Sequence, residues 1–141
     1  MERERERENL LDLIYRLKAG FVARECRIME ETGLSLAEYN GIAAINLREI
    51  ISCNALSQKM GLSPSRASRI LDKMVKNGYL VRENDTLDRR KCTISLAKKG
   101  MDIKKKIDRL NSDCEKKIYD RLSDQEITLI VDGLKKIINA F

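Results

Sequence analysis

The chain has no histidine, no tryptophan and only one proline among its 141 residues. The lack of histidine excludes an imidazole metal site and catalysis by a histidine base. No run of about 18 apolar residues occurs, so we expect no transmembrane helix. Residues 1–8 alternate glutamate and arginine after the first methionine and lack the apolar segment of a secretory signal. We therefore expect a cytoplasmic protein with no membrane partner.

The chain has four cysteines, the most reactive of its scarce residue types. None lies in a C-x-x-C pair, so we expect neither zinc nor another cofactor, and disulfides are unexpected in a cytosolic chain. Cys26, Cys92 and Cys114 fall on apolar stripes and are interpreted as small core residues. Cys53 follows Ser52, a predicted helix N-cap, where the helix dipole favours a thiolate. Cys53 is therefore a candidate redox residue.

Positive charge is concentrated in one third of the chain. Residues 52–100 contain eleven Lys and Arg against four Asp and Glu, an excess of seven. The rest of the chain has seventeen basic and eighteen acidic residues, so the net charge of +6 originates in this segment. A polyanionic partner explains such clustering, because each neutralised phosphate releases counterions. The alternative is a solvated basic face with no ligand.

Most of the chain repeats apolar residues at helical spacing, which predicts a mainly α fold. The helices are expected at about 4–30, from 35 onward, at 53–61, 63–77 and 98–121, and from 123 onward. Ser35 with Glu38, and Ser123 with Glu126, have the spacing of a capping box. The last helix is too apolar on one face to remain in water, which favours a dimer.

A β-wing is predicted directly after the helices at 53–61 and 63–77. Segments 79–82 and 91–96 resemble two antiparallel strands joined by the polar turn 83–88. Two short helices followed by such an arm form a winged helix-turn-helix, which is typical of proteins that read double-stranded DNA.

The second of these helices is expected to be the recognition helix, with Ser63 as N-cap and Pro64 at its first position. The DNA-contacting residues would lie in its first turns, where Arg side chains can bond guanine and Ser hydroxyls can bond phosphates or bases. They are Ser63, Ser65, Arg66, Ser68 and Arg69. The alternative is a solvated helix surface.

Two further arginines lie at or near the tip of the predicted wing. We expect Arg90 to enter the minor groove, whose negative potential attracts arginine. Arg89 is expected to contact phosphate or to hold the arm, for example by pairing with Asp88.

Residues 62–100 read LSPSRASRILDKMVKNGYLVRENDTLDRRKCTISLAKKG, which resembles the recognition helix and wing of MarR-family transcriptional regulators. The shared elements are Ser63-Pro64-Ser65, Arg69, the run 71–80, Asp88-Arg89-Arg90, and Leu96 with Lys99-Gly100. The resemblance implies a homodimer held by the first, fifth and sixth helices on a pseudo-palindromic operator. It also implies repression that is relieved by a small aromatic effector or by thiol oxidation. The segment 46–51 departs from the family pattern, because it is more apolar and more charged than the polar connection that is usual there.

Three segments follow from this interpretation: a dimerisation helix at 1–33, a winged helix-turn-helix at 34–100, and dimerisation helices at 101–141. An effector pocket between them would use Tyr15, Phe21 and Tyr39, for which ordinary core packing is the alternative. The function predicted is a dimeric, sequence-specific DNA-binding regulator, with a repressor as the expected mode.

Three other functions are alternatives to this one. A winged-helix protein-interaction module would have an apolar or acidic recognition helix, which Arg66 and Arg69 argue against. A thiol peroxidase using Cys53 lacks a neighbouring base or any other catalytic motif. A regulator that senses oxidants through Cys53 stays open.

Overall fold

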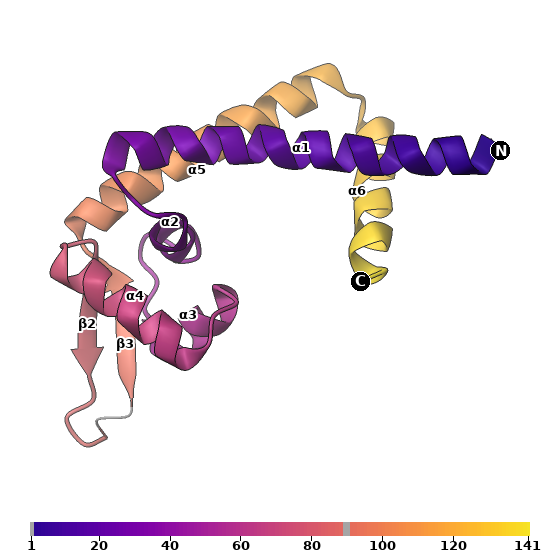
Figure 1. Cartoon of the computed structure of the whole chain (residues 1–141). Helices are drawn as coiled ribbons and strands as arrows, with labels where there is room; N and C mark the ends of the chain where they lie inside the picture. Colours follow the sequence, from indigo (N-terminus) through magenta and orange to yellow (C-terminus); the bar gives the residue numbers. More distant parts are fainter. Residues whose placement is uncertain (1, 89–90) are drawn as a thin grey trace.

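The computed structural model of the chain describes residues 2–88 and 91–141 (Figure 1). It is mainly helical with a small sheet, as predicted. The elements in order are α1 (Glu2–Thr32), α2 (Leu36–Ala43), β1 (Ile51–Ser52), α3 (Cys53–Lys59), α4 (Pro64–Lys76), β2 (Leu80–Asn84), β3 (Cys92–Leu96), α5 (Lys98–Arg121) and α6 (Asp124–Asn139). Within the described ranges, no helix is both long and apolar enough to span a bilayer.

Side-chain caps determine where several helices begin. In α2, the backbone N–H of Glu38 donates to Ser35 Oγ at 3.2 Å, and the Ser35 N–H donates to the Glu38 carboxylate at 3.4 Å. The same reciprocal pair opens α6, where Ser123 and Glu126 exchange hydrogen bonds of 3.1 and 3.2 Å. Both predicted capping boxes are confirmed. The hydrogen bonds from Ser123, chiefly from its backbone N–H, lower the pKa of Glu126.

The sheet has three antiparallel strands in the order β1-β3-β2. In the β2–β3 hairpin, Leu80 pairs with Leu96 at one end and Asn84 with Cys92 at the other. Strand β1 adds an edge through the pair of Ile51 with Ile94. The sequence did not predict β1, because two residues are too few to show the alternation that marks a strand.

The core joins the helix-turn-helix to the sheet and to α5. Its largest fully buried side chains come from α2, the segment after it, α3, α4, β3 and α5. They are Ile42, Ile45, Leu56, Leu71, Met74, Ile94 and Ile107. Figure 1 shows α1 running along α5 and past it, while α6 projects from the far end of α5. The described side chains of α6 include none that is buried, so this helix is left without a covering layer in the single chain.

Candidate nucleic-acid interface

Helix α4 begins as the sequence predicts. Ser63 Oγ accepts a hydrogen bond from the Arg66 N–H at 3.4 Å, and the Ser63 carbonyl accepts one from the Ala67 N–H at 2.9 Å. Pro64 occupies the first helical position, where its missing N–H costs nothing and its fixed φ suits the helix. The cap therefore sets the N-terminus of the predicted recognition helix.

The two faces of α4 separate cleanly. Ala67, Leu71 and Met74 are buried against the core, as predicted, while Ile70 and Val75 are half-buried. The five predicted DNA-contacting residues of this region are all exposed: Ser63, Ser65, Arg66, Ser68 and Arg69. Lys73 and Lys76 continue the exposed basic surface toward the end of the helix. Helix α4 therefore has one polar, cationic face, and the side chains of its N-terminal turns on that face are exposed.

The wing is the β2–β3 hairpin with its turn. The turn is held by its own backbone, since the Asp85 N–H donates to the Lys91 carbonyl at 2.9 Å and the Lys91 N–H donates to the Asp88 carbonyl at 3.0 Å. Asp85 also accepts the Leu87 N–H through its carboxylate at 3.0 Å. Arg89 and Arg90 lie outside the described residues, so minor-groove contact by Arg90, and the alternative roles of Arg89, stay predictions.

An ion pair that the sequence did not predict ties the wing to α4. Arg82 on β2 donates from a guanidinium nitrogen to the carboxylate of Asp72 on α4. Arg82 is mostly buried, and Asp72 is more than half exposed. The two residues are ten positions apart across a turn, a spacing that carries no local signal. The pair is a direct side-chain link between β2 and α4.

Lys104, whose role the sequence did not predict either, anchors α5 to α2. Its side chain is buried, its Nζ donates to the Ala43 carbonyl at 2.7 Å, and Asp108 lies 3.5 Å away. A cation at the C-terminal end of α2 complements the helix dipole there. The signal was present, because Lys104 shares the i, i+3, i+4 spacing of the apolar stripe with Ile103 and Ile107.

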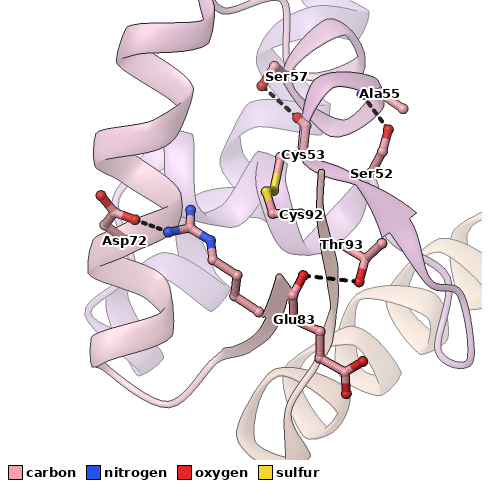
Figure 2. Close-up of a disulfide and its surroundings, with 9 residues drawn as sticks. Ser52, Cys53, Ala55, Ser57, Asp72, Glu83, Cys92 and Thr93 are labelled. Atoms are coloured by element: carbon pink, nitrogen blue, oxygen red, sulfur yellow. Dashed lines mark hydrogen bonds and ion pairs between the residues drawn. A yellow bond between two sulfur atoms is a disulfide. The ribbon is translucent and has the colours of Figure 1, made fainter. Parts of the chain in front are cut away.

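A disulfide joins Cys53 at the start of α3 to Cys92 at the start of β3, with the two Cα atoms 5.8 Å apart (Figure 2). The expectations that Cys92 is an unpaired core residue and that the chain has no disulfide are therefore wrong. The partners are 39 positions apart in the sequence, so no local pattern indicates the pairing, which arises only because α3 packs against β3. Cys26 and Cys114 are free and half-buried.

The three predicted effector residues do not line one common pocket. Tyr15 and Phe21 are exposed on α1, whereas Tyr39 is buried in the core. Burial, and then the negative charge of Glu25, raise the pKa of Tyr39, while Arg24 opposes this shift. Phe21 and Tyr39 meet at a cavity of about 20 Å³, which has room for one water molecule rather than for an aromatic compound. Phe21 also lines a larger, open apolar groove of about 620 Å³ along α1 and α5.

Helices α3 and α4, the exposed cationic face and the β2–β3 arm together define a winged helix-turn-helix protein. Residues 34–92 match the model of the MarR family. The matched segment, which includes the helix-turn-helix and β2, is therefore similar to the MarR family of transcriptional regulators. Among curated proteins the chain is similar to the HTH-type transcriptional regulator SarZ of Staphylococcus saprophyticus. The two are 26% identical over 141 residues, with 96% of this chain and 92% of SarZ covered.

Solved structures share the fold over nearly the whole chain. Streptococcus pneumoniae FabT, solved in complex with DNA, superposes with a TM-score of 0.80 at 22% identity, covering 96% of this chain and 94% of FabT. A MarR family protein from Bacillus stearothermophilus gives a TM-score of 0.75 at 22% identity, covering 97% and 96%. These likenesses confirm the winged-helix architecture that the sequence predicts.

Proposed function

We propose that this chain is a MarR-family regulator that acts as a dimeric, sequence-specific DNA-binding repressor. The observation that carries the proposal is the N-terminal half of α4, where Arg66 and Arg69 lie exposed on a helix whose opposite face is buried. A recognition helix needs its first turns free to reach base edges in the major groove. The excess of positive charge in residues 52–100 supplies the phosphate attraction, and FabT, which shares the fold, was solved with DNA.

The proposed dimer rests on the apolar surface that the single chain leaves open. Helix α6 exposes Ile130, Leu134 and Ile138, and α1 exposes a row of leucines with Phe21. Exposed apolar surface of this extent marks an interface. A second copy that contributes the same segments, 1–33 and 101–141, would cover it with two-fold symmetry. The segment 34–100 would then present α4 and the wing to one half of a pseudo-palindromic operator.

Release by an effector is the finer part of the proposal. The groove of about 620 Å³ along α1 and α5 is lined mainly by apolar groups and includes Leu17, Phe21 and Ile118. A small aromatic ligand held there would touch the same helices that are proposed to form the dimer, and could alter the spacing of the two recognition helices. We propose that the protein acts in the cytoplasm, where its DNA lies.

Removing one recognition-helix arginine tests base readout. Selection from random duplex DNA at a fixed salt near 0.15 M should recover an inverted repeat with half-sites about 34 Å apart, one turn of duplex. Against that operator, Arg66→Ala and Arg69→Ala should each cost about 1–3 kcal/mol and relax specificity at one base position, measured by fluorescence anisotropy on operators with single substitutions.

Arg109→Ala is the matched control, because it removes an arginine that is also exposed but lies on α5. It should leave the base preference of each position unchanged. If Arg66→Ala and Arg69→Ala weaken binding equally on all sequences, these residues contact phosphate. If selection recovers no motif and binding is only weak and steeply salt-dependent, the proposal of a sequence-specific regulator is wrong.

A further inference from the structure

Exposed large apolar side chains occur in two parts of the described chain. Most lie on α1, α5 and α6, where the proposed dimer would cover them. The others belong to the segment 34–100 and are Leu36 (54% exposed), Ile50 (73%), Val81 (43%) and Leu87 (96%). Figure 1 shows the turn that follows β2 pointing away from the helices, far from α6. A dimer formed through α1 and α6 therefore leaves Leu87, in that turn, in water.

The local fold of the turn does not require leucine at position 87. Turns favour Gly, Asn, Asp and Ser, whose small or polar side chains suit the backbone angles and bond nearby backbone groups. The backbone of Leu87 takes part in the turn, since its N–H donates to the Asp85 carboxylate at 3.0 Å. Its side chain, in contrast, lies almost wholly in water and forgoes the free energy of burial. Leu87 thus has apolar surface to offer a partner.

Hydrogen bonds of the turn hold Leu87 in a defined place. The Asp85 N–H donates to the Lys91 carbonyl at 2.9 Å, and the Lys91 N–H donates to the Asp88 carbonyl at 3.0 Å. Directly behind the turn, the pairing of Asn84 with Cys92 begins the β2–β3 ladder. A side chain presented on such a turn loses little conformational freedom when it meets a partner.

The sequence of the turn favours an apolar contact with DNA over phosphate attraction. Residues 83–91 contain three acidic and three basic side chains, so the excess of seven positive charges in residues 52–100 comes from outside this stretch. The minor groove, about 6 Å wide, is too narrow for a helix but admits the side chains of a turn. Proteins that bind this groove use apolar side chains, leucine among them, to unstack a base step and bend the duplex.

We propose that Leu87 is an apolar wedge that enters the minor groove of the operator and inserts at one base step in each half-site; this rests on the proposed DNA-binding function. Pyrimidine–purine steps such as TA unstack most easily, whereas A-tracts are stiff. The wedge therefore reads the deformability of DNA rather than a pattern of hydrogen-bonding groups. It adds specificity beside the major groove that Arg66 and Arg69 are proposed to read.

The test uses the full-length protein on its selected operator, with 2-aminopurine replacing one adenine at a time in the flanks that the wings would reach. Unstacking raises the fluorescence of 2-aminopurine, so the wild type should raise it at one step in each half-site. Leu87→Ala should abolish the rise and weaken binding by about three- to tenfold. Leu87→Met should keep both, because methionine also serves as a wedge. Replacing the unstacked step by AA should weaken the wild type and leave Leu87→Ala unaffected.

Two exposed residues of the wing supply matched controls. Thr86→Ala changes the neighbouring turn residue, and Val81→Ala removes apolar surface from β2 rather than from the turn. Both variants should keep the fluorescence rise and the operator affinity. The wedge is refuted if no step unstacks when the wild type binds, or if Leu87→Ala keeps the rise or the full affinity. Base-specific binding without unstacking refutes the wedge alone, whereas failure to select any operator refutes the proposed function and the wedge together.

Discussion

Placing a negative charge in the apolar face of α6, by Leu134→Glu, should convert the protein to a monomer and weaken binding to the full operator by about 10²–10⁴-fold. Leu134 is 46% exposed in the single chain and lies among other exposed aliphatic side chains of α6. In the proposed dimer, a carboxylate there would lose its hydration without a partner. The operator loss is large because the dimer makes binding of its second half-site intramolecular, and that advantage disappears when the two copies separate.

Two measurements decide this prediction. Sedimentation equilibrium should show a dimer for the wild type and a monomer for Leu134→Glu, and anisotropy should show that affinity for an isolated half-site is unchanged. Gln125→Glu is the control, because it adds the same charge at an exposed polar position of α6. A Leu134→Glu protein that remains dimeric and keeps its full-site affinity would refute α6 as part of the interface.

Gly100→Ala should lower the free energy of unfolding by about 1–3 kcal/mol. A Cβ at this position in the first turns of α5 would lie 2.1 Å from the Tyr79 carbonyl oxygen, which is backbone and cannot rotate away. The same carbonyl accepts the Ala97 N–H at 2.9 Å, so moving it breaks the hydrogen bond that precedes α5. The higher helix propensity of alanine, about 1 kcal/mol, offsets only part of this cost.

Urea unfolding followed by circular dichroism measures the loss. Gly20→Ala in α1 is the matched control, since no atom beyond its own helix backbone and chain neighbours lies within 4 Å of the added Cβ. Gly20→Ala should be neutral or stabilising by up to about 1 kcal/mol. Equal midpoints for Gly100→Ala and the wild type would show that α5 can shift away from Tyr79 at little cost.

Local signals were sufficient to predict the helices and the face of α4. The Ser63 cap followed by Pro64 set where α4 begins, and the spacing of Ala67, Leu71 and Met74 set which side is buried. Once that side is buried, Arg66 and Arg69 must lie outside. These features depend on residues within one or two turns of each other, so the sequence order alone contains them.

Contacts between distant segments were not predictable in this way. The Arg82–Asp72 ion pair, strand β1 and the position of Lys104 against Ala43 each need two elements already packed together. The disulfide is the clearest example. The alternation of Cys92 with Ile94 and Leu96 predicted that Cys92 faces inward, but it did not predict that Cys53 is its partner.

By itself, therefore, the sequence determined that this protein is a winged helix-turn-helix, with a basic face on the second helix of the motif and an apolar C-terminal helix. Only the tertiary structure decided that Cys53 meets Cys92, that Asp72 holds the wing through Arg82, and that Gly100 lies against Tyr79. The physical reason is that capping and periodicity act over a few residues along the chain, whereas a covalent bond, an ion pair or a steric contact depends on where the folded chain returns.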